Sequence, residues 1–491
     1  MKKQIAIIGS GFGGLSVSIY LALKGFDVTI FEKNSQVGGK ASEIISNGFR
    51  FDGGPTLITM PFVLQDLFLS AGKDLDKYIS LRKKDLVCRY FFSDGSIFNE
   101  YSNKEKLLEE FEKFTNEKKD NLIKYLNYSK NIYDLTAELF LFSPFLNFKN
   151  FFNPKGLRTL FNLYKIDTFR TVHNANESFF SSKKIVQYFD RYATYNGSNP
   201  YYAPATLNII PFVEIELGGF YSEGGVYRIV ENLSELAKEI GVKIFTNSEV
   251  EKILFNNKKV KGLKVNGIEK RYDIVISNAD LFYTYQNLIG EVKSKEPERY
   301  IKQELSTSAV IFYFGVKVKS TNLEMDNILF SGNYEKEFHQ LFVEKIIPDD
   351  PTIHIHISSK KNKTDAPEGF ENWYVMINVP SVKNQKIDVD KVKKIIFDKI
   401  KQMTGLIIED KIVVEEIQTP KILEERTSSL FGSLYGPASN NRYSAFLRQK
   451  NKSSVYDGLY FCGGTVHPGG GIPLVILSGK ITAELIQRFE K

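Results

Sequence analysis

The chain has 491 residues, of which 42% are hydrophobic, 25% charged and 13% aromatic, and its formal net charge is +7. This composition excludes a disordered tail, a collagen-like repeat and a coiled-coil rod, and the length predicts more than one domain. Two cysteines and five histidines exclude a disulfide scaffold and a cysteine-rich metal site, so we expect a cytoplasmic protein with no metal centre.

The first 23 residues allow two interpretations. Met1-Lys2-Lys3 followed by the uncharged residues 5–23 has the outline of a signal peptide or a short membrane span. Four glycines within this stretch cost helix stability, however, and their spacing favours a nucleotide-binding turn instead.

A strand, a glycine turn, a helix and a second strand are predicted in succession. Residues 4–8 are expected to form a buried strand, 15–23 a helix and 27–31 another strand. The turn at 9–14 fits G-x-G-x-x-G, and the helix that follows it offers free N–H groups to phosphate. The sequence therefore predicts a dinucleotide-binding unit.

Each part of this unit has its own task. Gly9 permits the tight turn, Gly11 lets the backbone approach a pyrophosphate, and Gly14 lets the helix pack closely on the strand. Glu32, at the end of the second strand, is expected to accept ribose hydroxyls and to repel a 2′-phosphate. Paired glycines at 38–39 and 53–54 let the backbone approach a second part of a long cofactor, and Lys40 is expected to hold a phosphate.

Residues 139–165 hold seven phenylalanines, four basic residues and no acid. Pro144 and Pro154 interrupt any long helix, which disfavours a transmembrane span. The segment is either a buried helical layer with charged edges or an interfacial segment whose aromatic side chains enter lipid. No other feature supports nucleic-acid binding, so none is expected. The candidate membrane-contacting residues are Phe142, Phe145, Phe148, Lys149, Phe151 and Phe152.

Further along, 226–240 is predicted as an amphipathic helix, followed by short strands at 243–245, 250–254 and 260–265 and at 273–276. Strand-like runs recur at 309–316, 352–357 and 373–379. His354 and His356 are two residues apart and share a strand face, but no acidic neighbour completes a metal site. We therefore expect an ordinary half-exposed strand there.

The C-terminal part repeats the opening theme. Residues 457–462 are predicted as a turn and a buried strand, 463–473 contain five glycines, and 474–489 form a helix. Glycines before a helix again indicate close backbone approach to a ligand. The two ends of the chain would then meet at one cofactor.

Several of these segments resemble a known family. The glycine pairs after Glu32 resemble the flavoprotein family of amine oxidases, protoporphyrinogen oxidases and carotenoid desaturases. Segment 463–473 resembles the carotenoid (phytoene-type) desaturases, as do 191–197, 218–228 and 365–369. The resemblance runs along essentially the whole chain, and 461–468 is most similar to the hydroxycarotenoid 3,4-desaturase branch.

The resemblance implies FAD as cofactor and an α/β fold, a Rossmann-like FAD-binding domain with an inserted α+β substrate domain. The FAD-binding domain would comprise 1–65, 220–285 and 426–491. The substrate domain would comprise 66–219, which we expect to be mainly helical, and 286–425.

The resemblance further implies an FAD-dependent carotenoid desaturase of carotenoid biosynthesis. It would introduce a C-3′,4′ double bond into a 1′-hydroxylated carotenoid such as 1′-hydroxy-gamma-carotene, with oxygen or a quinone as electron acceptor. The alternatives are a phytoene or diapophytoene desaturase, an amine oxidase of the same fold and a carotenoid isomerase. A hydrophobic substrate favours peripheral association with a membrane lipid surface.

His467 is the candidate proton acceptor, because its glycine loop should lie near the flavin; alternatively, it merely orders that loop. The expected cofactor-binding residues are Gly9, Gly11, Phe12, Gly13, Gly14, Glu32, Lys33, Gly39, Lys40, Gly54, Pro55, Thr56, Val250, Asn278, Gly463, Gly464, Gly471 and Ile472.

Overall fold

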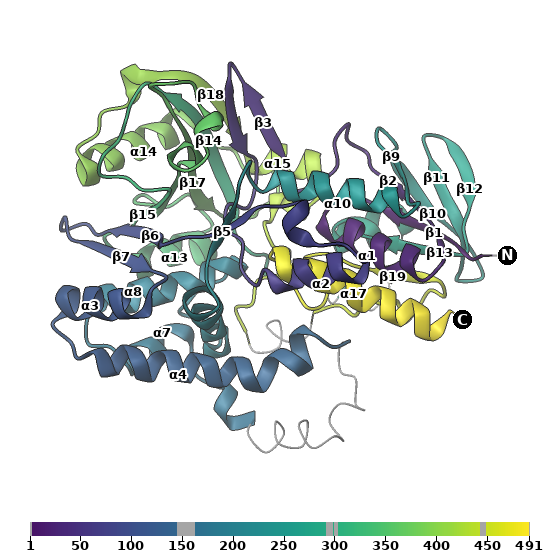
Figure 1. Ribbon diagram of the computed structural model, residues 1–491, viewed down its shortest axis with the longest axis horizontal. Coiled ribbons are helices and arrows are strands. Elements are labelled where there is room, and N and C mark those ends of the chain that lie inside the picture. The colour runs from purple at the N-terminus through teal and green to yellow at the C-terminus, as the bar shows by residue number, and fades with distance from the viewer. Residues whose placement is uncertain (1, 145–162, 291–297, 299–302, 442–447, 491) are drawn as a thin grey trace.

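The computed structural model describes residues 2–144, 163–290, 298, 303–441 and 448–490. A parallel sheet with its helices and a larger, mostly antiparallel sheet dominate this part of the chain, and a helical layer lies below the larger sheet (Figure 1).

The parallel sheet is built from three distant parts of the chain. Its order is β9-β2-β1-β13-β19, and all its pairings are parallel. Its strands are nearly continuous apolar runs, as expected for a sheet that is buried on both faces. The five strands predicted for these segments are confirmed, at Lys243–Phe245, Asp27–Phe31, Gln4–Ile8, Ile274–Ser277 and Leu459–Phe461.

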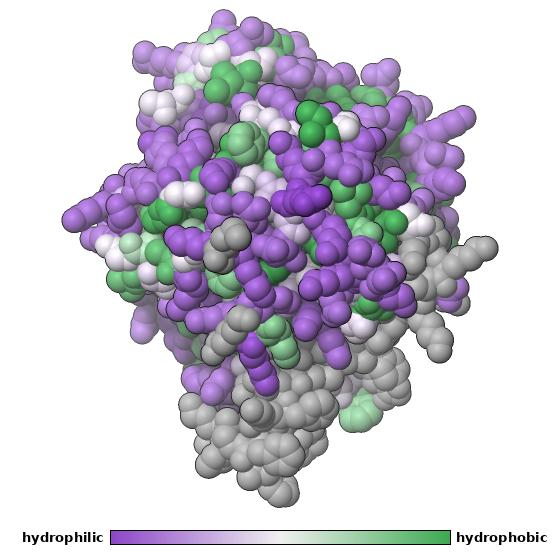
Figure 2. Space-filling model, turned by 90° about the vertical axis from the view of Figure 1, so that its right-hand side faces the viewer, coloured by the Kyte–Doolittle hydropathy of each residue, from purple (hydrophilic) through white to green (hydrophobic). Residues whose placement is uncertain are grey.

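Helices and a small sheet cover the two faces of this parallel sheet. Helices α1 (Phe12–Leu23), α10 (Tyr227–Glu239) and α17 (Ile472–Phe489) share one hydrophobic core with it. On the other face, a second core contains residues of β10 (Val250–Asn256) and β11 (Lys259–Val265), which pair with β12 (Ile268–Arg271). On the side of the molecule where this small sheet lies, hydrophobic patches are scattered among hydrophilic side chains (Figure 2).

The larger sheet has seven strands in the order β18-β14-β17-β16-β15-β6-β7. Only the pairing of β15 with β6 is parallel among these strands. Residues 66–219 were expected to be mainly helical, yet they supply β6 and β7, so that expectation was incomplete. The strands span Ile412–Gln418, Ser308–Val316, Glu371–Val379, Ile353–His356, Asp326–Leu329, Leu86–Phe91 and Ile97–Tyr101.

The two faces of this sheet have different partners. Helix α14 (Val389–Thr404) packs on one face, where Val392, Ile396 and Ile400 join a core with alternate residues of β14 and β17. Because side chains alternate along a strand, the intervening residues point to the opposite face. That face borders an interior cavity.

A helical layer completes the molecule. Helices α3 (Lys104–Thr115), α4 (Lys119–Thr136), α7 (Val172–Glu177), α8 (Lys183–Asp190) and α13 (Tyr334–His339) lie beside β6 and β7 (Figure 1). Tyr, Phe and Leu side chains dominate the core here, which accounts for much of the high aromatic content. The remaining elements are β3 (Glu43–Ser46), β4 (Phe49–Asp52), β5 (Leu81–Lys83), β8 (Phe220–Ser222), α2 (Phe62–Ser70), α9 (Ile209–Pro211), α11 (Leu281–Tyr283) and α15 (Pro420–Thr427).

Of the helices in the described ranges, none is both long and apolar enough to cross a membrane. Phe145, Phe148, Lys149, Phe151 and Phe152 lie outside the described residues. Phe142 is described: it is half-buried, and its ring centroid lies 6.2 Å from that of Phe62.

Candidate functional site

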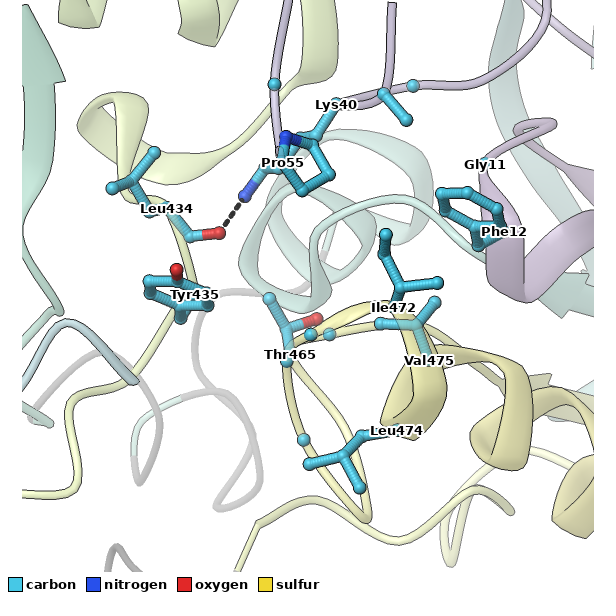
Figure 3. Close-up of a pocket in the computed structure, with 18 of the residues that line it drawn as sticks. Gly11, Phe12, Lys40, Pro55, Leu434, Tyr435, Thr465, Ile472, Leu474 and Val475 are labelled. Atoms are coloured by element: carbon cyan, nitrogen blue, oxygen red, sulfur yellow. Dashed lines mark hydrogen bonds between the residues drawn. The ribbon is translucent and has the colours of Figure 1, made fainter. Parts of the chain in front are cut away.

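A cavity of about 600 Å³ lies between the carboxyl ends of the parallel strands and the seven-stranded sheet. Ligands of open α/β sheets bind at such carboxyl ends, so the topology itself indicates a binding site. The starts of α1 and α17 and the segment around Tyr435 surround one hollow (Figure 3). Of the expected cofactor residues, those that line the cavity are Gly9, Gly11, Phe12, Glu32, Lys33, Gly39, Lys40, Gly54, Pro55, Thr56, Val250, Asn278, Gly463, Gly464, Gly471 and Ile472.

The first glycine turn packs tightly against β1 and β13 on the side that faces away from the cavity. A Cβ atom on Gly14 would lie 2.1 Å from the carbonyl oxygen of Gly9, and one on Gly13 would lie 2.5 Å from Oδ1 of Asn278. Gly13 and Gly14 therefore allow close packing of α1, β1 and β13. The N-cap residue of α1 is Gly11, which brings no side chain to cap the helix. The N–H groups of the first turn and the helix dipole can therefore serve a phosphate.

The second helix start faces the same space. Gly471 is the N-cap residue of α17 and likewise has no capping side chain. A Cβ atom on Gly13 would lie 3.1 Å from the backbone nitrogen of Gly463, so the N-terminal and C-terminal glycine segments touch. The expected meeting of the two chain ends at one cavity is thus present in the structure.

Glu32 is buried at the end of β2 and is held by four hydrogen bonds. Its Oε2 accepts from the backbone nitrogen and the hydroxyl of Ser10, at 2.9 and 2.7 Å. Its Oε1 accepts from the backbone nitrogen and Nδ2 of Asn34, at 3.0 and 2.7 Å. These bonds fix a carboxylate beside the glycine turn, where a ribose would lie relative to a phosphate on α1.

The two lysines expected at the cofactor contact protein groups. Lys40 Nζ donates to the carbonyl oxygens of Ser433 and Leu434, at 2.8 and 2.6 Å (Figure 3). Lys33 Nζ donates to the carbonyl of Glu425 and the hydroxyl of Ser428. Burial lowers the pKa of Lys40 to about 8. Both side chains join the N-terminal loops to residues 425–434.

His467 is buried, and its position favours the second of its two predicted roles. Its Nε2 lies 2.9 Å from the carbonyl oxygen of Ser143, which can only accept, so Nε2 carries a proton. Burial lowers the pKa of His467 to about 4, and Arg448 adds to this effect. The imidazole is therefore neutral at pH 7 and ties the C-terminal glycine loop to the segment after α4.

One group of cavity residues that the sequence analysis missed lies at 426–439 and at Arg448. Arg426 donates from Nη2 to the carbonyl of Gly53 and to Oε1 of Gln418, which joins the second glycine loop to β18. Arg448 donates to the carbonyls of Tyr435, Pro437 and Gly464. These arginines bond four segments around the cavity, and no local sequence pattern indicates this role.

A second missed group is a polar cluster on the substrate side, where the seven-stranded sheet borders the cavity. The expectation of a half-exposed strand at 353–356 was wrong: His356 is buried, and His354 faces the cavity. Both rings bond Oδ1 of Asp326, His354 through Nε2 at 3.0 Å and His356 through Nδ1 at 2.8 Å. Lys84 Nζ pairs with the other oxygen of Asp326.

The charges of this cluster determine its protonation. Burial alone would raise the pKa of Asp326, but Lys84, His356 and His354 outweigh it and hold that pKa well below its usual range. Burial lowers the pKa of His354, so the ring is neutral at pH 7. A neutral ring that donates from Nε2 to a carboxylate keeps its Nδ1 as an acceptor. Among the described residues, no His, Cys, Asp and Glu groups are arranged to hold a metal ion.

Arg191 and a pair of carboxylates adjoin the cluster. The Tyr192 hydroxyl lies 3.2 Å from both Glu100 Oε1 and Glu214 Oε1, and the Tyr195 hydroxyl bonds Glu214 Oε2. Burial and the nearby Glu214 raise the pKa of Glu100, so this pair retains a proton near neutral pH. Arg191, Tyr195 and Glu214 line the cavity.

Comparisons with known proteins agree on one family. The family model for flavin-containing amine oxidoreductases matches residues 12–487. A 1-hydroxycarotenoid 3,4-desaturase from Flavobacterium sp. (strain P99-3) is 42% identical over 99% of both chains. A 4,4′-diapophytoene desaturase (4,4′-diaponeurosporene-forming) from Staphylococcus haemolyticus is 32% identical over 98% of both. The crystal structure of an oxidoreductase from Methanosarcina mazei, 15% identical, matches the fold with a TM-score of 0.63 over 98% of this chain and 100% of that one.

Proposed function

Because this chain belongs to the flavin-containing amine oxidoreductases and, within them, to the carotenoid desaturases, we propose that it introduces a C-3′,4′ double bond into a 1′-hydroxylated carotenoid. The observation that carries the proposal is a single cavity with two parts. One part is the glycine cradle, by which we mean the start of α1, Glu32, the loop at 53–56 and the glycine segment at 463–472, and the other part is lined by apolar side chains. The full-length similarity to a 1-hydroxycarotenoid 3,4-desaturase selects the substrate class.

FAD is the cofactor, and bound FAD supplies the two-electron oxidation of a carbon–carbon single bond. The start of α1 and Glu32 are the groups that would hold its adenine nucleotide part. The loop at 53–56 and the glycine segment at 463–472 would hold the remainder. The glycine cradle fits FAD for two reasons. Its glycines pack closely against neighbouring backbone, and no side chain caps the start of α1, where a phosphate would bind.

The rest of the cavity suits a long apolar substrate. Its walls carry aliphatic side chains from several elements, so a polyene would contact apolar groups along much of its length. Binding then consists mainly of positioning one carbon–carbon bond against the cofactor. Representative wall residues are Met60, Leu141, Leu207, Ile210, Val213 and Val475.

We further propose that the substrate enters from a lipid surface, with oxygen or a quinone as electron acceptor. Leu141 lines the cavity, and its neighbour Phe142 packs against Phe62 at the start of α2. Phe62 and Leu69 of α2 are 39% and 69% exposed. An exposed apolar edge beside a cavity wall is suited to contact lipid, and the predicted membrane-contacting segment begins there.

The test is turnover by purified holoprotein of three substrates: 1′-hydroxy-gamma-carotene, phytoene and 4,4′-diapophytoene. We expect the hydroxylated carotenoid to lose two hydrogens, seen as a mass decrease of about 2 Da and a longer-wavelength absorbance maximum. Turnover of phytoene or 4,4′-diapophytoene alone would instead support the alternative desaturase. A product of unchanged mass would contradict both desaturase functions and indicate isomerisation.

A further inference from the structure

We propose that Arg191 and His354 form a binding site for the hydroxyl group at the end of the substrate, an inference that rests on the proposed function. Arg191 would donate a hydrogen bond to the hydroxyl oxygen, and Nδ1 of His354 would accept the hydroxyl proton. A hydroxyl both donates and accepts, so it needs one partner of each kind.

Arg191 has donors to spare. In the described part of the chain, its guanidinium donates only from Nη1, to the hydroxyls of Tyr90 and Tyr195 at 3.1 and 3.5 Å. The side chain is partly buried and lines the cavity, and its guanidinium also lies over the rings of Tyr90 and Tyr195, at 5.5 and 5.3 Å. No hydrogen bond of its Nε or Nη2 is seen among the described residues, so these donors are available to a ligand oxygen in the cavity.

His354 offers the complementary acceptor. Its Nε2 is committed to Asp326, which Lys84 and His356 hold ionised, so the tautomer with a bare Nδ1 is fixed. Burial lowers the pKa of His354, and the charge of Arg191 adds to this effect, which keeps the ring neutral. The guanidinium of Arg191 lies 5.5 Å from the ring centroid of Tyr90, and Tyr90 pairs with Ile328, which pairs with His354, so both side chains lie over the same part of the sheet.

The surroundings favour a ligand without charge. Lys84 and His356 already contact Asp326, and Arg191 lies near Glu214. A charged ligand would have to lose its hydration shell to enter this interior group, which is costly. A hydroxyl adds hydrogen bonds without adding charge.

The location also suits an end group. Across the sheet, Ile311 pairs with Met376 and Met376 pairs with His354, so the floor of the cavity turns from apolar to polar within two strands, about 10 Å. A Cβ atom on Gly219 would lie 3.1 Å from Leu57 and 3.2 Å from Val87, and the carbonyl of Gly219 accepts from the backbone nitrogen of Lys84. The polar cluster therefore adjoins the 53–57 loop. A 1′-hydroxyl is only two carbons from C-3′, so its binding site has to lie this close to the cofactor.

The experiment compares binding of 1′-hydroxy-gamma-carotene with 1′,2′-dihydro-gamma-carotene, which has the same saturated end without the hydroxyl. Dissociation constants are measured by absorbance titration with detergent-solubilised carotenoid and holoprotein. We expect the wild type to prefer the hydroxylated ligand by about tenfold or more. Arg191→Gln and His354→Leu should each bring this ratio close to one.

His339→Leu is the matched control. It makes the same substitution as His354→Leu at a histidine that also bonds a carboxylate, that of Glu344, but its side chain is 53% exposed and does not line the cavity, so the ratio should remain at its wild-type value. Folded Arg191 and His354 variants that keep the wild-type ratio would overturn the proposal; if the Arg191 variant does not fold, the His354 variant decides. Wild type that desaturates both ligands and binds them equally would refute the hydroxyl site alone, whereas wild type that desaturates neither would refute the proposed function.

Discussion

The two ends of the cavity are built in opposite ways. The glycine cradle uses short contiguous segments, in which Gly9, Gly14 and Glu32 lie within 24 residues of one another. The polar cluster on the seven-stranded sheet uses Lys84, Arg191, Asp326 and His354, which come from four separate parts of the chain. The first depends on backbone geometry, and the second depends on pairing between charged side chains.

This difference indicates which substitutions each end of the cavity tolerates. Backbone packing leaves no room for an added atom but does not depend on pH. A buried charge network accepts small changes of shape, yet it fails when one partner loses its charge. Four substitutions can break or sharpen this comparison.

The largest effect is expected from Gly14→Ala. The added Cβ would meet the carbonyl oxygen of Gly9 at 2.1 Å, so β1 and α1 would have to separate. We expect a loss of more than about 5 kcal/mol in unfolding free energy and purified protein without flavin. Flavin absorbance and thermal unfolding measure this. Gly25→Ala, where nothing lies within 4 Å of the added atom, should cost about 1–2 kcal/mol through its positive φ and keep FAD.

Asp326→Asn tests the charge network. Removing this charge leaves Lys84 buried without an ionised partner, so we expect the unfolding free energy to fall by about 3–5 kcal/mol. The glycine cradle should stay intact. Because the pKa of Asp326 is depressed in the folded protein, its contribution is complete above its unfolded pKa of about 3.9 and is lost as the pH falls through the lower folded value. Chemical denaturation from pH 5 down to pH 2 should show the beginning of this loss in the wild type and not in the variant.

The matched control for this variant is Asp398→Asn. Asp398 pairs with Lys394 on the exposed surface of α14, and its side chain is 63% exposed. We expect its stability to stay within about 0.5 kcal/mol of wild type. An Asp326 variant as stable as this control would show that the network does not hold the sheet together.

The same contrast explains what the sequence could predict of the fold. The strands of the parallel sheet carry uninterrupted apolar runs next to glycine turns, so local pattern located β1, β2 and β9 to the residue. The pairing of β6 with β15 joins segments more than 230 residues apart, and the local sequence of neither strand indicates its partner. The first insertion was therefore predicted as mainly helical.

The site divides in the same manner. Backbone approach to a ligand needs glycine, and glycine is visible in the sequence. The partners of charged side chains are not: the spacing of His354 and His356 correctly indicated a shared face, but Asp326 lies 28 residues away on another strand. Lys40 was expected to hold a phosphate because its positive charge is visible, whereas the carbonyls that it contacts lie 393 and 394 residues along the chain.

His467 ties the C-terminal glycine loop to the segment after α4, and His467→Gln tests what it does there. Its folded pKa of about 4 lies below the unfolded value of about 6.5, so its contribution is complete above pH 6.5 and is lost as the pH falls to 4. Between pH 6.5 and pH 4, we expect the unfolding free energy of the wild type to fall by about 3 kcal/mol more than that of the variant, as measured by denaturant unfolding. Turnover by the variant should fall less than about tenfold, since glutamine can still donate to Ser143; a decrease of 100-fold or more would restore His467 as the proton acceptor.

Lys40→Met has the smallest expected effect. It tests whether Lys40 binds a phosphate of FAD or the protein carbonyls that it contacts in the structure. If Lys40 holds the carbonyls of Ser433 and Leu434, as the contacts indicate, the variant should lose about 1–2 kcal/mol of stability and bind FAD within about threefold of wild type. A phosphate-binding lysine would instead cost roughly ten- to 100-fold in FAD affinity, because a charge-assisted hydrogen bond would be lost. Titration of the apoprotein with FAD distinguishes the two. The stability difference should also depend on pH: burial lowers the pKa of Lys40 to about 8, so wild type should gain stability relative to the variant as the pH rises above 8.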